Sequence, residues 1–217
     1  MASCFRWRTL RGPLLAVSVF VSSLAIAQSD SAPTASDELI HVLDQTKSLQ
    51  GRFRQQQFDS GEVLVGESTG RFAMLRPGYF SWQIESPDSQ LIIATPEFIW
   101  HHDLDLETVT RRPLESSGAA SPLQILGGEE DLLRSNFTVS KSADGVFTLT
   151  PNAGDNGQAF SRLSLTLEDG VLSVMEIIDA LNQHVVIRFE EVTRPNLSTE
   201  DFAFTPPDGV DLFYYDQ

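Results

Sequence analysis

The chain is dominated by short segments in which apolar and polar side chains alternate, separated by turns of only a few residues. Alternation with a period of two is typical of β-strands with one buried face, and connections this short join only antiparallel neighbours. A sheet of about ten or eleven antiparallel strands does not stay flat, so we predict that it curls toward a barrel with an apolar interior. The predicted strands cover residues 51–59, 62–75, 79–85, 90–94, 97–102, 107–111, 137–141, 145–150, 160–167, 171–179 and 184–192.

Three short helices are predicted to accompany this sheet. Residues 37–48 carry apolar side chains at helical spacing, and Ser36 is available as the N-cap. Between residues 113 and 136 the alternation stops, and Ser121-Pro122 and Glu129-Glu130-Asp131 are typical of two helix starts. Because these helices can cover the open side of the sheet, the predicted fold class is α+β.

Residues 1–27 have the pattern of a secretory signal peptide. Basic residues precede an apolar run that ends at Ile26, and small residues stand before Gln28, where cleavage is expected. We expect residues 28–217 to form a single mature domain; a retained membrane anchor is the alternative. The single cysteine, Cys4, lies ahead of the apolar run. It therefore cannot be the lipid-modified first residue of a lipoprotein, and the mature chain has no thiol.

The charge balance of the chain is strongly acidic. The sequence has 15 lysines and arginines against 30 aspartates and glutamates, a net charge of −15, and loss of Arg6, Arg8 and Arg11 with the signal makes the mature chain more acidic still. Such a surface repels phosphates and anionic head groups. We therefore expect no nucleic-acid partner and no stable membrane association. A plain contribution to solubility is the other interpretation of this charge.

One segment joins a fixed cation to an aromatic strand: Arg76-Pro77-Gly78-Tyr79-Phe80-Ser81-Trp82. Because alternate side chains of a strand share a face, Phe80, Trp82 and Ile84 lie together on one side. A strand with such a face lines either a core or a lipid pocket.

The polar residues give little support to an enzyme or a metal site. In His101-His102-Asp103 neighbouring side chains point to opposite faces of a strand, so we predict no metal ion there. Ser121 and Ser164 lack a glycine elbow, and His41 and His184 have no recognisable catalytic context, so no catalytic residue is assigned. The acidic runs Glu129-Glu130-Asp131 and Glu190-Glu191 fit a helix start and a solvated strand end.

Three motifs resemble the family of the outer-membrane lipoprotein carrier protein LolA. The first is Leu49-Gln50-Gly51-Arg52-Phe53-Arg54-Gln55, and the second runs from Gly70 to Trp100. The third, Phe202-Ala203-Phe204-Thr205-Pro206-Pro207-Asp208-Gly209-Val210, is the most specific. The sequence departs from the family at Thr95-Pro96-Glu97, where an Asp-Gly turn is usual, and at His101-His102-Asp103-Leu104, where tyrosine and proline are common.

The resemblance implies an unclosed antiparallel barrel whose apolar concave face is covered by helices acting as a lid. In the family the arginine that matches Arg76 hydrogen-bonds the lid and locks it, and the residue that matches Phe80 faces lipid. Composition alone would make these residues a solvated arginine and an ordinary core aromatic, and the face that each strand turns to the cavity is left open. The predicted acyl-chain-lining residues are Phe72, Met74, Phe80, Trp82, Leu91, Ile93, Phe98 and Trp100.

The resemblance also implies a function. A member of this family is a monomeric periplasmic chaperone of a Gram-negative bacterium that takes lipoproteins from the inner-membrane complex LolCDE and delivers them to the outer-membrane acceptor LolB. It needs no cofactor, and the sequence has no phosphate-binding loop. One alternative is a carrier of other lipids or other hydrophobic cargo. A second is the acceptor itself, which the position of Cys4 disfavours. A third is a lipid hydrolase of the envelope, which is disfavoured because the sequence has no nucleophile motif.

Overall fold

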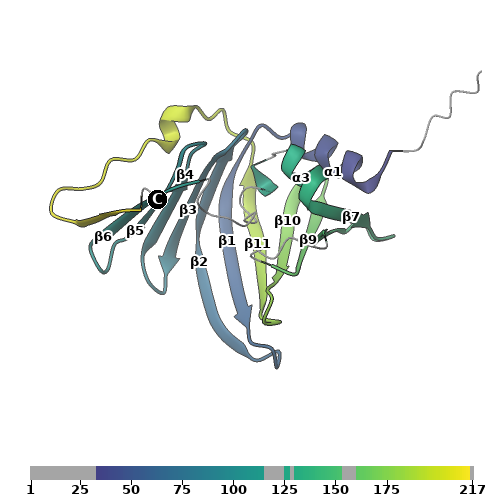
Figure 1. Cartoon of the computed structure of the whole chain (residues 1–217), viewed down its shortest axis with the longest axis horizontal. Coiled ribbons are helices and arrows are strands. Elements are labelled where there is room, and N and C mark those ends of the chain that lie inside the picture. The colour runs from purple at the N-terminus through teal and green to yellow at the C-terminus, as the bar shows by residue number, and fades with distance from the viewer. Residues whose placement is uncertain (1–32, 115–124, 128–129, 153–159, 216–217) are drawn as a thin grey trace, which may run out of the picture. The chain divides into compact units, whose positions relative to one another are not determined.

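A computed structural model describes residues 33–114, 125–127, 130–152 and 160–215. Its centre is one sheet of twelve strands in the order β12-β6-β5-β4-β3-β2-β1-β11-β10-β9-β8-β7 (Figure 1). Every neighbouring pair is antiparallel except β12 and β6. The strands are β1 Ser48–Phe58, β2 Leu64–Leu75, β3 Tyr79–Ser86, β4 Gln90–Ala94, β5 Phe98–Asp103, β6 Thr108–Pro113, β7 Phe137–Lys141, β8 Phe147–Pro151, β9 Arg162–Glu168, β10 Val171–Ile178, β11 His184–Thr193 and β12 Asp211–Tyr214.

The first helix, α1, spans Ala35–Asp44, and its N-cap is Thr34. The prediction of Ser36 was wrong because Thr34 forms a reciprocal capping box: its hydroxyl accepts from the Asp37 backbone N–H at 3.2 Å, and the Asp37 carboxylate accepts from the Thr34 N–H at 3.0 Å. The helix also ends before residue 48, because Ser48 already pairs with Leu75 in the sheet.

The predicted helices between residues 113 and 136 are described in part. Helix α3 spans Glu130–Asn136. Ile125 and Leu126 are helical and buried, whereas Ser121-Pro122 lies outside the described residues. The 1–27 signal segment lies outside them too.

The strand prediction missed the end of the chain. A 3-10 helix, η2, spans Thr199–Phe202, and Asp211–Tyr214 forms β12, which runs parallel to β6. All four β12 residues are exposed. A strand without a buried face has no alternation of apolar and polar side chains, so its sequence carries no strand signal.

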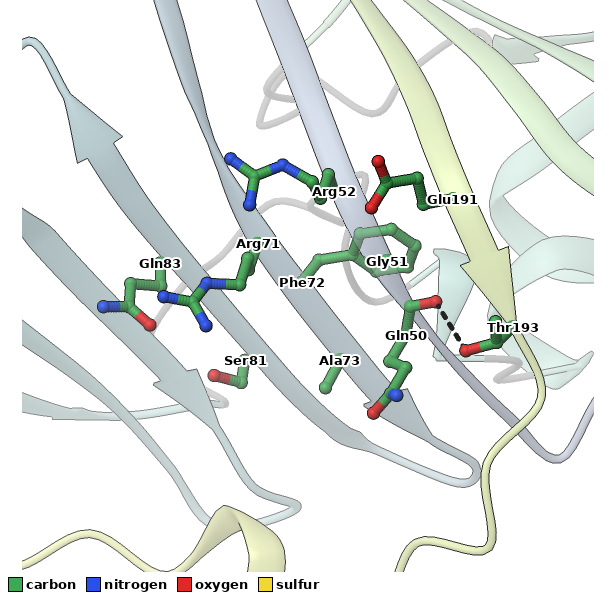
Figure 2. Close-up of a pocket in the computed structure, with 10 residues that line it drawn as sticks. All are labelled: Gln50, Gly51, Arg52, Arg71, Phe72, Ala73, Ser81, Gln83, Glu191 and Thr193. Atoms are coloured by element: carbon green, nitrogen blue, oxygen red, sulfur yellow. Dashed lines mark hydrogen bonds between the residues drawn. The ribbon is translucent and has the colours of Figure 1, made fainter.

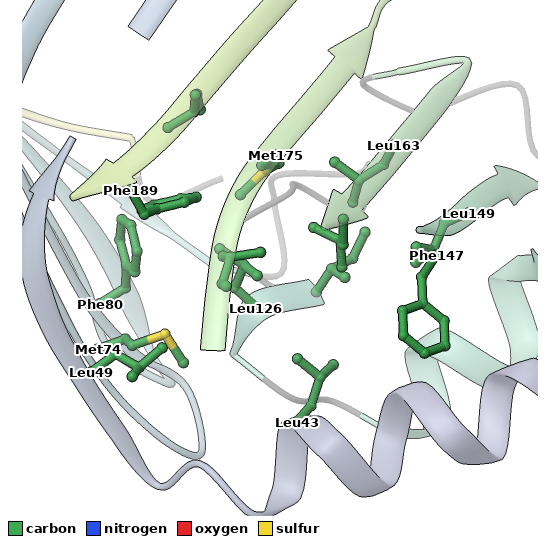
Figure 3. Packing of buried hydrophobic residues seen from close by; sticks show 14 of the residues in the cluster. Leu43, Leu49, Met74, Phe80, Leu126, Phe147, Leu149, Leu163, Met175 and Phe189 are labelled. Atoms are coloured by element: carbon green, nitrogen blue, oxygen red, sulfur yellow. The ribbon is translucent and has the colours of Figure 1, made fainter. Parts of the chain in front are cut away.

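The main hydrophobic core lies on the face of the sheet that the helices cover. Figure 3 shows Leu43 from α1 and Leu126 opposite sheet residues that include Met74, Phe80 and Phe189. These side chains belong to one buried cluster that continues along the sheet to β8 and β9. We call this the inner face, and the opposite side of the sheet the outer face.

Candidate functional site

An aromatic cluster forms the centre of the inner face. Trp82 stacks on Phe53 with ring centroids 3.6 Å apart and on Phe80 at 5.8 Å, and its edge meets Phe189 at 6.3 Å. The ring of Phe53 has room because Gly70 stands beside it: a Cβ there would lie 2.8 Å from Phe53 and would overlap the carbonyl oxygen of Gln83. The glycine therefore permits the aromatic side chains of this cluster to pack closely.

The eight predicted lining residues divide between the two faces. Phe72 pairs with Trp82, and Met74 with Phe80, so these four share the inner face and are buried. In β4 and β5 the other four lie on the outer face, because Ser81 pairs with Ile93 and Ile93 with Trp100. The outer-face residues are Leu91, Ile93, Phe98 and Trp100.

The outer-face group is covered by the end of the chain. Phe204 lies 5.4 Å from the Trp100 ring, and Phe202 lies 5.8 Å from Tyr79. The Arg111 guanidinium lies 4.4 Å from the Phe98 ring centroid, which makes a cation–π contact. These residues form a second apolar layer, separated from the inner face by the thickness of the sheet.

Arg76 lies at the edge of the inner core, just after β2. It lines a void of about 10 Å³ together with Leu43 of α1, Leu49, Met74 and Leu126. Burial lowers the pKa of the Arg76 guanidinium to about 10, and Asp44 opposes that change only in part. Nε and Nη1 are buried and have no hydrogen-bond acceptor among the described residues. The expected hydrogen bonds to the helical covering are therefore not made by these two atoms within the described part of the chain.

Ion pairs at the surface fasten the helices to one another and to the sheet. Arg134 of α3 contacts Asp37 of α1 at 2.7 Å and Glu130 at 2.9 Å, and Lys141 of β7 contacts Glu38 at 2.5 Å. Hydrogen bonds from Thr34 and Arg134 lower the pKa of Asp37 to about 2. The helical covering is thus held by ion pairs at its rim and by apolar contacts beneath.

A polar recess of about 480 Å³ lies on the outer face of β1, β2, β3 and β11 (Figure 2). Two of its arginines share one carboxylate: Glu85 contacts Arg52 at 3.1 Å and Arg71 at 2.5 Å. Hydrogen bonds from Arg71 and Arg52 lower the pKa of Glu85. A recess lined by guanidinium, amide and carboxylate groups does not suit an acyl chain.

The other polar candidates are scattered over the described part of the chain. His101 and His102 pair with Ile92 and Leu91, so the two rings lie on opposite faces. His41 is exposed and contacts Gln45 at 2.7 Å. Within residues 33–114, 125–127, 130–152 and 160–215, no three His, Cys, Asp or Glu side chains are grouped to hold a metal ion. No helix in those ranges is both long and apolar enough to cross a bilayer.

Sequence reasoning missed two inner-face residues. Phe53 is 2% exposed and stacks on Trp82, and Phe189 packs edge-on against Phe72 at 5.0 Å. The sequence could have indicated Phe53, because the residue lies in the first motif. There the period-two alternation places it on the side of β1 that faces the inner core. Phe189 required the pairing of β1 with β11, which joins Phe53 to Phe189 across the sheet.

Comparisons with known proteins agree with this architecture. The family described as "Outer membrane lipoprotein carrier protein LolA" matches residues 44–205. Proteins named outer-membrane lipoprotein carrier protein from Azotobacter vinelandii and Dechloromonas aromatica are 32% and 36% identical; the alignments cover 92% and 82% of this chain, and 96% and 86% of theirs.

Among solved structures, a LolA superfamily protein from Nitrosomonas europaea has a TM-score of 0.51 at 13% identity, over 80% of this chain and 99% of its own. An uncharacterized conserved protein from Thermus thermophilus has a TM-score of 0.52 at 11% identity, over 84% and 100%. These two show the fold alone. The family match and the curated relatives establish that the chain belongs to the outer membrane lipoprotein carrier protein LolA family.

Proposed function

We propose that this protein is a periplasmic chaperone that accepts lipoproteins released by LolCDE, shields their acyl chains against its inner face, and delivers them to LolB. The observation that carries the proposal is the inner face itself. Phe72, Met74, Phe80 and Trp82 form a continuous apolar surface beneath helices that are fastened at their rim by ion pairs. The names of the curated relatives support the same role.

The energy of lipid transfer explains why such a surface is needed. Burying one methylene group is worth about 0.8 kcal/mol, so a sixteen-carbon chain is worth about 12 kcal/mol. A chain of that kind does not leave a membrane at a useful rate unless the carrier offers it an equally apolar environment. Release from the membrane is assigned to the ATP-driven partner, and the carrier supplies the apolar surface.

In this proposal cargo and covering compete for the same contacts. The void beside Arg76 is about 10 Å³, far too small for an acyl chain. In this proposal an entering chain displaces α1 and the helical residues around Leu126 from the inner face. Loading exchanges one set of apolar contacts for another, so its net free energy is small compared with the gross burial of the chain.

Arg76 keeps this exchange reversible. Its guanidinium is buried beside apolar side chains, and Nε and Nη1 have no hydrogen-bond acceptor within the described residues. A buried charge without full hydrogen bonding is costly. An acyl chain bound beside Arg76 also buries this incompletely hydrogen-bonded charge, so the same unfavourable free energy weakens its binding. The loaded complex is then stable enough to travel and still able to release its cargo.

The test is to incubate the mature protein with spheroplasts that make a labelled lipoprotein, in the presence of a working LolCDE complex. A soluble one-to-one complex that passes its label to LolB is the expected result. If the label stays in the membrane while the protein is folded, the lipoprotein function is refuted. Carriage of other lipids, which the apolar inner face can also hold, is then tested with labelled phospholipid.

A further inference from the structure

Two adjacent hairpins of the sheet are closed by turns of the same construction. In the β1–β2 turn, the Asp59 carboxylate accepts from the backbone N–H groups of Gly61 at 2.9 Å and Val63 at 3.0 Å. In the β10–β11 turn, the Asp179 carboxylate accepts from Leu181 at 2.7 Å and Gln183 at 2.8 Å. A left-handed residue completes each turn, Glu62 with φ 61° and Asn182 with φ 58°. Both turns therefore have a defined backbone shape.

These two well-defined turns present large apolar side chains to solvent. Val63, Leu64 and Val65 are 58%, 49% and 60% exposed, and Leu181 is 72% exposed. Three consecutive exposed residues mean that this end of β2 has both of its faces in water, because successive side chains point in opposite directions. We call Val63, Leu64, Val65 and Leu181 the apolar tip.

The two hairpins lie next to each other at one end of the sheet (Figure 1). Strands β1 and β11 pair as far as Phe58 and His184, whose rings are 5.9 Å apart. The His184 imidazole lies 4.0 Å from the Glu62 carboxylate of one hairpin and 3.8 Å from that of Glu176 on the other. The two turns that carry the apolar tip are thus neighbours at one end of the sheet.

Acidic side chains border the apolar tip. Asp59 and Glu62 lie in the first turn, Asp179 lies in the second, and Glu176 lies on β10 close to it. The neighbouring strands also carry arginines: Arg54 pairs with Glu67 at 3.1 Å, and Arg162 lies opposite Ile178. An anionic bilayer surface is repelled by such a border. A protein surface that is apolar at its centre and bordered by lysine or arginine complements it in both respects.

We propose that the apolar tip is a docking surface for a handover partner, a protein whose contact surface is apolar and bordered by basic residues. The inference rests on the proposed carrier function, because a shuttle must recognise the proteins that load and unload it. Turns of defined shape lower the entropy cost of docking, since the backbone is ordered before contact. Acidic side chains around the patch raise the rate of association with a basic partner.

The experiment measures binding of the mature protein to immobilised LolB without its lipid anchor and to LolCDE in nanodiscs. The tip variant combines Val63→Ser with Leu181→Ser. Leu106→Ser is the matched control, because Leu106 is 71% exposed in the β5–β6 turn, separated from the tip by β3 and β4. The tip variant should raise the Kd for at least one partner by about tenfold, and the control should change it by less than about twofold.

A third variant tests the charge. Glu62→Lys should slow association at low salt, and the difference from wild type should shrink as salt screens the contact. Vesicles of phosphatidylcholine, with and without phosphatidylglycerol, should bind none of the proteins. Vesicle binding that the tip variant alone loses would make the tip a lipid contact and would overturn the proposal.

Equal binding of wild type and tip variant to both partners, or no binding of wild type to either, also overturns the proposal. The carrier function is read separately, from the soluble lipoprotein complex formed in spheroplasts. If wild type and tip variant form that complex and hand over cargo equally well, the docking inference alone fails. If wild type forms no complex, the carrier function fails.

Discussion

Replacing Arg76 by leucine should make the empty protein more stable. Burial lowers the pKa of the Arg76 guanidinium from its ordinary value to about 10, and each pKa unit corresponds to about 1.4 kcal/mol, so burial costs the charged side chain about 3 kcal/mol. Because the unfolded chain holds the proton more tightly, this cost is present in full at neutral pH and falls only above about pH 10. Leucine removes the charge and fits beside Leu43 and Met74.

Leucine is smaller than arginine, so part of the gain is lost to imperfect filling of the site. We expect a net gain of about 2 kcal/mol, which raises Tm by about 4 to 8 °C for a domain of this size. Thermal and urea unfolding of the mature protein measure it. Arg76→Lys is the matched control, because it keeps a buried cation and should give a Tm equal to or below that of wild type.

A lower Tm for Arg76→Leu would refute this reasoning. It would show that the guanidinium stabilises the closed protein through hydrogen bonds, as the resemblance to the family implies. In transport assays the leucine variant should still be loaded, because the proposed function assigns loading to ATP hydrolysis in the partner. Its handover to LolB should be at least about tenfold slower, since burial of an added leucine against cargo is worth about 1.5 to 3 kcal/mol.

Three further substitutions test the packing and the capping. Trp82→Ala should cost about 3 to 5 kcal/mol in urea unfolding, whereas Trp100→Ala, in the half-buried outer layer, should cost clearly less; equal costs would contradict the two-layer arrangement. Asp37→Asn should lower Tm at neutral pH, and the difference should shrink as pH falls from about 4 and vanish below the folded pKa of about 2; a difference that is as large at pH 2 as at neutral pH would contradict the capping role. Gly70→Ala should destabilise the fold by about 3 kcal/mol, while Gly66→Ala, where a Cβ meets nothing closer than 3.7 Å, should be nearly neutral by the same unfolding measurement.

The sequence predicted the long antiparallel strands because alternation and turn residues agree there. The strand ends shifted where a side chain closes a turn: Asp59 delays β2 from residue 62 to Leu64, and Ser142 with Gly145 delays β8 from residue 145 to Phe147. Such hydrogen bonds are local, but they compete with strand pairing in a way that alternation alone does not report.

The division of the predicted lining residues could not be derived from alternation. Leu91, Ile92 and Ile93 are consecutive apolar residues, so β4 has no polar face to mark the solvent side. Both faces are apolar because the helices cover one and the C-terminal segment with Phe204 covers the other. Only the register of β3 against β4, which places Ile92 opposite Trp82, assigns the faces.

The ion pairs that hold the helical covering contribute little free energy compared with the burial of the cargo's acyl chain. The pairs from Arg134 to Asp37 and Glu130, and from Lys141 to Glu38, are partly exposed, and surface ion pairs are worth about 0 to 1 kcal/mol each. An acyl chain of sixteen carbons gains about 12 kcal/mol on burial. The covering must therefore be held chiefly by apolar contacts such as those of Leu43 and Leu126, the same contacts that cargo replaces. Because these large terms nearly cancel, small terms such as the ion pairs and the buried charge of Arg76 decide whether the chaperone holds its cargo or gives it up.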